Sequence, residues 1–366
     1  YQEWVDKVRI RLTDIKTEPQ AVGLNLTTKA LMGVFGYTRE DVERLIKPKA
    51  INGQEPVLSM GNDAPLAVLS NQPKSLYDYF RQLFAQVTNP AIDPIREEMV
   101  TSLVSFIGPR PDLLNIMDNN PPIRLEVQQP ILDAVEMEKI RNISKYTDNK
   151  FRSKQLDITY PLSWGKDGIE ARLASIRAAA IDAVKTGHNI LIISDRNVAA
   201  DRLAIPALLA TSAVHLCLVE NGLRTSTGLV VETGSARTVH QFALLGGYGA
   251  EAIHPYVALQ VVAELAPDAQ SVKTYQDNYI HAIDKGLYKT MAKMGICTYM
   301  SYIGAQIFEA VGLSQEFVDK YFTNTPSPIE GVGLFDIAQE AVKTHKDAFK
   351  KIALQDPSLA QGGDLN

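Results

Sequence analysis

A polar triplet follows a short apolar run in the second half of the chain. Residues 190–194 read ILIIS, and Asp195 and Arg196 come directly after Ser194, so a hydroxyl, a carboxylate and a guanidinium group are adjacent. The run has the β-branched composition of a buried strand, and α/β folds keep their functional groups in the loops after such strands. We therefore take Ser194, Asp195 and Arg196 as candidate functional residues, with local capping and pairing as the alternative.

One histidine adds to these candidates. The chain has six histidines, and none has a second histidine or a cysteine at metal-ligand spacing, so zinc or iron chemistry has no support. His254 ends a further predicted strand, at 251–254, and precedes Pro255. It is the histidine that we expect at a site.

A glycine run and two cysteines complete the chemical inventory. The run GGYG at 246–249 could offer backbone N–H groups to a phosphate, but it lacks dinucleotide and Walker spacing, and a helix end followed by a tight turn explains it equally well. Cys217 and Cys297 are too few for a disulfide framework or an iron–sulfur cluster, and neither stands beside a basic cluster. No G-x-S-x-G motif occurs, so nucleophilic catalysis has no visible agent.

These candidates require a strand–helix framework to position them. Short β-branched runs alternate with longer amphipathic ones from about residue 156, which is the pattern of strand–helix units on a parallel sheet. The expected strands are 156–160, 190–194, 229–232, 251–254 and 296–299. The expected helices are 167–186, 206–220, 236–245, 256–265 and 272–294. The predicted fold class is α/β with barrel-like units and functional residues at strand carboxyl ends.

The first 150 residues predict a mainly helical, partly irregular part. Thr38 and Asp41 form a capping pattern for a short helix that Pro48 should stop. Apolar residues recur at helical spacing over 76–87 and predict one buried helix face. A proline-rich elbow at 86–94 follows, and Pro94 has the first-turn position of a further helix.

Three parts are therefore expected along the chain. They are the helical and irregular part at 1–150, the α/β core at 151–332, and a closing part at 333–366. The closing part should hold a helix over about 333–352 and then a glycine-containing linker.

Composition argues against two classes of partner. The 37 basic and 42 acidic residues give a net charge of −5, whereas a protein that binds the phosphate backbone needs a basic face. The longest apolar stretch, 203–219, contains Pro206 and His215 and is typical of a buried helix rather than a bilayer span. We expect neither nucleic acid nor membrane as a partner.

Several long runs carry a family resemblance. They are SMGNDAPLAVLS at 59–70, LYDYFRQLFAQVTNPAIDPIRE at 76–97, LIISDRN at 191–197, VETGSAR at 231–237, HQFALLGGYGAEAIHP at 240–255, KGLYKTMAKMGICTYMSYIGAQIFE at 285–309 and YFTNTPSPIEG at 321–331. Together they resemble the central domain of the glutamate synthase large subunit. His240 begins HQFA where a double histidine is common in that family, and Pro328 stands where a basic residue is usual.

The resemblance implies a place in a four-part polypeptide. That family has a glutaminase with an N-terminal cysteine, a central domain, an FMN-binding barrel with an iron–sulfur cluster, and a β-helix. The central domain resembles a degenerate, flavin-free FMN-type barrel. Residue 1 is tyrosine here, so we expect no glutaminase nucleophile, and two cysteines cannot supply a cluster. The glycine run lacks the surrounding anion-binding residues that FMN would need, so we expect no FMN in this chain. The chain would be a fragment or a processed product.

The resemblance also implies partners and a location. The expected partners are the glutaminase and FMN synthase domains of the same polypeptide, with a small electron-transfer subunit or ferredoxin in the full enzyme. The expected location is the cytoplasm, or the plastid stroma in a plant or alga.

The resulting hypothesis is a connecting domain that contributes to ammonia channelling. Its candidate channel or interface residues are Thr88, Asn89 and Asp93 in the elbow, and Ser194, Asp195, Arg196 and His254 at strand ends. For the elbow, simple helix capping is the alternative. Two other functions stay open: an autonomous flavin-type barrel enzyme in which GGYG holds phosphate, and a pure interaction scaffold.

Overall fold

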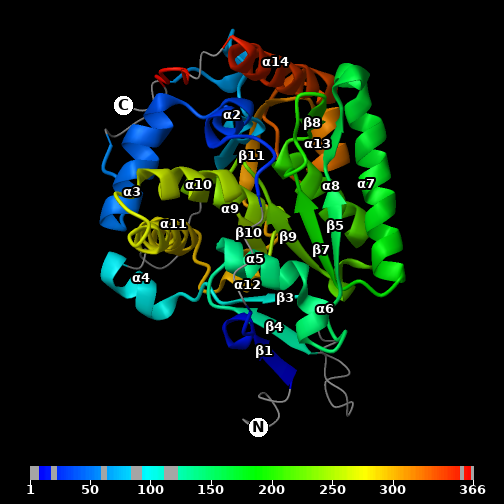
Figure 1. Cartoon of the computed structure of the whole chain (residues 1–366). Coiled ribbons are helices and arrows are strands. Elements are labelled where there is room, and N and C mark those ends of the chain that lie inside the picture. Colours follow the sequence, from blue (N-terminus) through cyan, green and yellow to red (C-terminus); the bar gives the residue numbers. More distant parts are fainter. Residues whose placement is uncertain are drawn as a thin grey trace.

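A four-stranded parallel sheet forms the centre of the molecule (Figure 1). The computed structural model describes residues 8–17, 23–58, 64–83, 93–110, 123–354 and 358–363. The sheet consists of β5 (Ser153–Asp157), β7 (Ile190–Ser194), β9 (Gly228–Glu232) and β10 (Ala252–His254), in the order β10-β9-β7-β5. β7 and β9 are buried at every position, which explains their continuous apolar runs.

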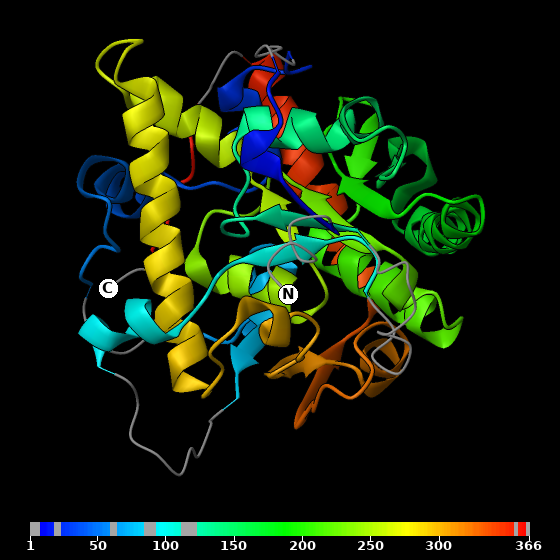
Figure 2. The same cartoon turned by 90° about the horizontal axis from the view of Figure 1, so that it is seen from below.

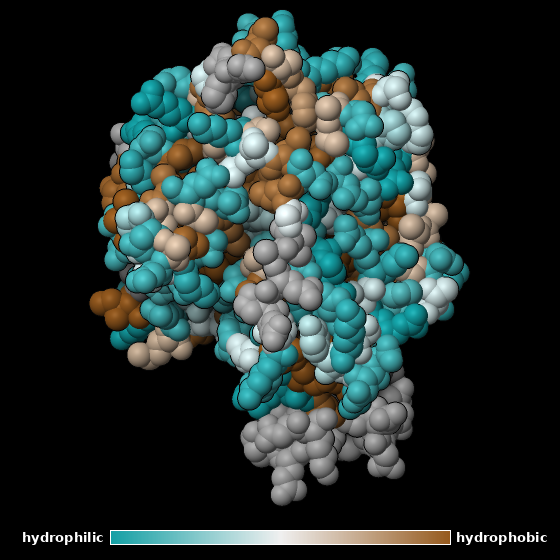
Figure 3. Space-filling model, in the orientation of Figure 1, coloured by the Kyte–Doolittle hydropathy of each residue, from teal (hydrophilic) through white to brown (hydrophobic). Residues whose placement is uncertain are grey.

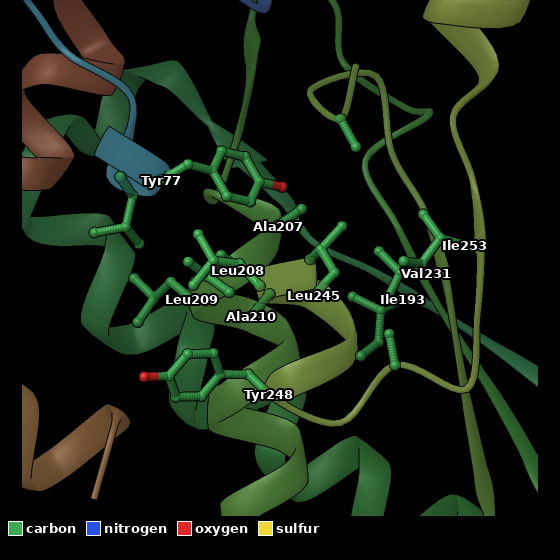
Figure 4. Packing of buried hydrophobic residues seen from close by; sticks show 14 of the residues in the cluster. Tyr77, Ile193, Ala207, Leu208, Leu209, Ala210, Val231, Leu245, Tyr248 and Ile253 are labelled. Carbon is green, nitrogen blue, oxygen red and sulfur yellow. The ribbon is translucent and has the colours of Figure 1, made fainter. Parts of the chain in front are cut away.

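The strands follow one another across the sheet in chain order, and their connecting helices cover one face. These helices are α7 (Gly168–Lys185), α8 (Ala207–Glu220) and α9 (Val239–Gly247). Their apolar side chains share a core with Ile193 and Val231, and Figure 4 shows this packing together with Tyr77 and Tyr248. Sequential parallel strands with all helices on one face are wound like a barrel rather than a doubly wound sheet.

A small second sheet packs on the opposite face. It consists of β1 (Arg9–Arg11), β4 (Arg124–Val127) and β3 (Ser105–Ile107), and Figure 2 shows it from below. Its apolar residues and those of α5 (Ala134–Arg141) share a second core with Ile190, Ile192 and Val230. Alternate residues of β7 therefore enter different cores, as the period of a strand requires.

The predicted α/β class is confirmed, and the barrel is degenerate because the four strands form an open sheet. Four of the five expected strands are present, although the first is divided into β5 and β6 (Thr159–Pro161). The expected strand at 296–299 is wrong. Residues 296 and 297 are irregular, and Thr298 forms one bridge to Ser102 before the short helix α12 (Tyr299–Tyr302). Tyr299 is fully buried, so aromatic packing and not strand pairing orders this segment.

Two N-terminal predictions are also wrong. Over the described residues 76–83, the expected helix at 76–87 is replaced by a 3-10 turn, η4 (Leu76–Tyr79), and by β2 (Phe80–Gln82), which pairs antiparallel with β11 (Phe308–Leu313). Residues 84–87 lie outside the described residues. A distant strand partner overrides the local periodicity. Pro48 does not stop the predicted helix: the π-helix η2 (Asp41–Ile46) continues directly into α3 (Lys47–Asn52). Pro48 is tolerated because it lies in the first turn of α3, where its missing N–H group is not needed. The capping box at Thr38 and Asp41 is present.

The remaining predicted helices are present, although α9 begins three residues later and ends two residues later than the expected 236–245. α10 (Tyr256–Leu265), α11 (Val272–Lys293) and α14 (Leu334–Ala353) lie within one residue of their expected bounds, and Pro94 begins α4 (Pro94–Val100). The further elements are η1 (Leu12–Asp14), α2 (Thr28–Val34), η3 (Ala67–Leu69), α6 (Ile143–Tyr146), η5 (Leu162–Asp167), β8 (Arg202–Ala204), η6 (Arg224–Ser226), α13 (Gln315–Tyr321) and β12 (Ile329–Val332). None of the described helices is long and apolar enough to cross a membrane.

The two end regions of the described chain meet. Ala360 forms a parallel bridge with Thr38, and the N–H groups of Arg39 and Glu40 donate to the carbonyl oxygens of Ala360 and Gln361. β2 and β11 likewise join residues near 80 with residues near 310. On the face shown in Figure 3, hydrophilic residues are interspersed with scattered hydrophobic ones.

Candidate functional site at the carboxyl edge of the sheet

Glu232 is the centre of a buried polar cluster at the ends of β7 and β9. Ser194 and Glu232 are register partners on these neighbouring strands. The Ser194 hydroxyl donates to Glu232 Oε2 at 2.6 Å, while Arg141 Nη2 and Arg196 Nη1 donate to Glu232 Oε1 at 2.7 and 3.1 Å. The parallel register thus gathers residues that are far apart in the sequence around one carboxylate.

The charge of Glu232 is balanced by its neighbours. Burial disfavours its ionised form, but His254, Arg141 and the Ser194 hydrogen bond outweigh burial and hold the pKa of Glu232 below its usual value. His254 is itself buried, and burial lowers its pKa, while its Nδ1 lies 2.8 Å from the Leu132 carbonyl oxygen. A carbonyl can only accept, so Nδ1 of His254 carries the proton.

Asp195 follows β7 and contacts the loop that follows β9, in a second group of hydrogen bonds beside the Glu232 cluster. Thr233 Oγ1 donates to Asp195 Oδ2 at 2.5 Å, and the Gly234 N–H donates to Oδ1 at 3.0 Å. Burial raises the pKa of Asp195 to about 7, although both hydrogen bonds act in the opposite direction. Asp195 therefore fixes the loop after β9, and its environment favours the protonated form.

The N-terminal segment covers this loop. The ring of Phe35 lies so close to Gly234 that a Cβ atom there would be 2.3 Å from it, and the Tyr37 hydroxyl donates to the Gly234 carbonyl at 2.9 Å. Arg237 donates to the carbonyl oxygen of Gly36, pairs with Asp41 at 3.0 Å and lies 4.4 Å from the centre of the Tyr37 ring. The edge where barrel enzymes usually hold their substrates is filled here by the chain's own side chains.

The cluster is not arranged for hydrolytic catalysis. The Ser194 proton is directed to Glu232 and not to an imidazole, so Ser194 and His254 do not form the nucleophile–base pair of a serine hydrolase. Ser194, Asp195, Glu232 and His254 are each at most 3% exposed. No set of three histidine, cysteine or acidic side chains within the described residues is placed to hold a metal ion. The geometry supports structural positioning of strand ends.

The elbow candidates lie apart from this cluster. Asp93 is exposed and caps α4 by accepting from the N–H groups of Ile95 and Arg96 at 3.0 and 3.1 Å. Its carboxylate therefore acts as a helix N-cap, as the capping alternative predicts. Thr88 and Asn89 lie outside the described residues, so their part in a channel stays a prediction.

The glycine run serves packing. Cβ atoms at Gly246 and Gly247 would lie 2.6 Å from the Tyr299 hydroxyl and 2.7 Å from the Phe308 ring, and Gly249 has a φ of 117° in the turn before β10. The helix-end interpretation of GGYG is therefore correct.

Sequence reasoning missed two members of the cluster. Glu232 was expected only as the last residue of a strand, and Arg141 was not singled out. The register of β7 against β9 brings Glu232 to Ser194. The signal that could have identified Glu232 is its place as an acidic residue at the end of an otherwise apolar strand. Nothing in the local sequence of Arg141 indicates its partner 91 residues away.

The fold and this edge together define a class of protein. It is an α/β domain with barrel-type winding, an open sheet, and strand ends closed by an N-terminal segment. The glutamate synthase central domain family matches residues 30–314 of the sequence. The chain belongs to this family.

Similar proteins come from bacteria, fungi and plants. The chain is 39% identical to the large chain of the NADPH glutamate synthase of Bacillus subtilis, over 96% of this chain and 23% of that protein. It is 40% identical to the NADH glutamate synthase of Schizosaccharomyces pombe, over 95% and 17%, and 38% identical to a chloroplastic ferredoxin-dependent glutamate synthase of Oryza sativa, over 96% and 22%. The chain thus spans less than a quarter of the length of these relatives.

Solved structures are less similar. A mutant flavocytochrome b2 with pyruvate bound aligns with 78% of this chain and 83% of that chain, at 12% identity and a TM-score of 0.33. A likeness of this size does not assign a fold.

Proposed function

We propose that this chain is the connecting central domain of a glutamate synthase. In this role it holds a glutaminase domain and an FMN-binding synthase domain together in one polypeptide, and it contributes to the passage of ammonia between them. The observation that carries the proposal is the match over 95–96% of this chain to a segment that makes up only 17–23% of full glutamate synthases. The remaining length of those relatives provides for the catalytic domains.

The closed carboxyl edge supports a connecting role. Phe35, Tyr37 and Arg237 occupy the space above the loop after β9, and the polar groups at that edge bond one another. FMN and the iron–sulfur cluster then belong to the neighbouring synthase domain, and electrons come from a small subunit or from ferredoxin. The location is the cytoplasm, or the plastid stroma in a plant or alga. The divisions 1–150, 151–332 and 333–366 are part of this proposal.

The test compares two rates in a full-length synthase that contains this segment. Free ammonia released from glutamine is measured beside consumption of 2-oxoglutarate. Arg237→Met removes the ion pair to Asp41 and the contact with Tyr37, which loosens the N-terminal segment over the sheet. Arg177→Gln, which breaks a half-exposed pair with Glu220 at 2.8 Å, is the matched control.

The expected result is leakage. Arg237→Met should release ammonia that is not incorporated, while glutaminase activity and synthesis from added ammonium are largely retained. The control should stay coupled. If Arg237→Met remains fully coupled in a folded enzyme with a loosened N-terminal segment, the channelling part of the proposal is wrong. A flavin spectrum or glutamine hydrolysis by the isolated chain would overturn the connecting role itself.

A further inference from the structure

A cavity lies at the opposite, amino end of the parallel strands. It has a volume of about 390 Å³, which is within the range of small-molecule sites. Its walls come from the region after β3, from α8, from η6 and from the loop after α12. The lining residues are Arg110, His215, Val219, Gly222, Arg224, Thr225, Ile303 and Gly304.

The cavity carries an excess of positive charge. Arg224 is 8% exposed, and Glu251 Oε1 lies 3.0 Å from its Nη2 and 3.8 Å from Nη2 of Arg110. Glu251 is fully buried. Within the described residues, two guanidinium groups are therefore paired with this one carboxylate, which leaves one positive charge for a further anion.

His215 adds a neutral donor to the same wall. Arg224 Nε donates to His215 Nδ1 at 3.0 Å, and because arginine cannot accept, the ring proton of His215 is on Nε2. Burial, together with the charges of Arg224 and Arg110, lowers the pKa of His215 to about 3. The Nε2 edge of the ring faces Gly304, since a Cβ atom there would be 3.2 Å from Cε1 and 3.5 Å from Nε2.

Arg224 and Arg110 differ in how many of their N–H donors bond to the protein itself. Arg224 also donates to the carbonyl oxygens of Thr227 and Gly249 at 2.7 and 3.0 Å, so most of its donors are committed to the protein. The Arg110 side chain is 38% exposed, and its backbone N–H, not its guanidinium, bonds the Thr225 carbonyl. Considering only the described part of the chain, Arg110 is therefore the group with donors available to a ligand.

We propose that this cavity binds a small organic carboxylate, whose carboxyl group contacts Arg110 and the Nε2–H of His215 and whose carbon chain lies against Val219 and Ile303. The two apolar side chains in the wall favour a carboxylate with a carbon chain over inorganic phosphate. Arginine matches a carboxylate with two parallel N–H donors. The site is independent of the strand-end cluster and of the connecting role.

The test is direct binding to the purified chain by titration calorimetry. The probes are butyrate and succinate, with butyramide as the uncharged match of butyrate and inorganic phosphate as an anion without a carbon chain. A carboxylate should bind with a dissociation constant of about 1 mM or lower. In the ¹⁵N spectrum of histidine-labelled protein, the same titration should shift the Nε2–H signal of His215.

Two variants locate the binding. Arg110→Gln should weaken carboxylate binding about tenfold or more, which is the effect of losing one charge-assisted contact. Arg44→Gln removes the same charge from η2, where the Arg44 side chain is 47% exposed and pairs with Glu40 at 3.0 Å, and this variant should bind as the parent does. Thermal unfolding establishes that Arg110→Gln is folded, which is expected because its backbone hydrogen bond is retained.

Three results would overturn the proposal. They are no binding of either carboxylate, binding of phosphate or butyramide as tight as that of butyrate, and unchanged affinity in Arg110→Gln. The first of these decides the matter on the parent chain alone, so the proposal is testable even if the variant is unstable.

Discussion

Removing the charge of Glu232 should destabilise the chain more than removing any exposed carboxylate. Glu232→Gln keeps the shape of the side chain but leaves Arg196 facing a neutral amide, while Arg141 retains its pair with Glu138 at 2.8 Å. Removing one partner of a buried ion pair typically costs about 3–5 kcal/mol. Because the Arg141 and Arg196 side chains are 23% and 14% exposed, water partly solvates them, and we expect a loss of about 3 kcal/mol.

The assay is urea unfolding of the purified chain, followed by far-UV circular dichroism at pH 7. Glu220→Gln is the control, since its pair with Arg177 is half-exposed and such pairs are worth about 0–1 kcal/mol. The two variants lose one carboxylate each, so they differ in burial and not in net charge.

The pH dependence provides an independent check. The pKa of Glu232 is lowered in the folded chain, so its ionised form stabilises the fold above the ordinary glutamate value and this contribution is lost as the pH falls through the folded value. The difference between parent and Glu232→Gln should therefore shrink below a pH of about 4. A loss under about 1 kcal/mol at pH 7, or a difference that does not change with pH, would refute the electrostatic account of this cluster.

Four further predictions follow from the described geometry and the proposed role. Because the pKa of Asp195 is raised to about 7 in the fold, stability should decrease as the pH rises from about 4 to 7, and Asp195→Asn should flatten that part of a plot of urea midpoint against pH; an unchanged slope would argue against it. Gly234→Ala should cost about 1–3 kcal/mol through overlap with the Phe35 ring, and the double variant with Phe35→Leu should recover part of the loss in thermal unfolding. Thr88→Trp in a full-length synthase should let glutamine hydrolysis outrun glutamate formation if the elbow lines the ammonia path, and strict coupling in a folded enzyme would remove the elbow from that path. The isolated chain should neither release ammonia from glutamine nor retain FMN through gel filtration, as measured by an ammonia assay and an absorbance spectrum.

Local pattern was sufficient for the α/β core. Strands β7 and β9 are buried on both sides, so their composition alone identifies them, and α7, α8 and α10 have the length and spacing of core helices. Ser194 and Arg196 were recognised as strand-end residues, because the carboxyl ends of parallel strands meet at one edge.

Features set by distant pairing could not be predicted in this way. Residues 80–82 read as part of a helix until β11 is placed beside them. The partners of Asp195 were not visible either, because Thr233 reaches it only through the alignment of β7 with β9. Long-range contacts of this kind depend on the register of whole elements and leave little local signal.

The meeting of the two end regions has a consequence for biosynthesis. Gly363 N–H donates to Glu40 across 323 positions of the chain. Similarly, β2 cannot pair until β11 has been synthesised. On a ribosome that adds about 5–20 residues per second, the N-terminal segment would remain without these partners for tens of seconds. The pairing of β2 with β11 and the contacts of residues 38–40 with residues 360–363 are therefore expected to form late in folding, after the central sheet, and a nascent chain halted before residue 308 would leave residues 80–82 without their strand partner.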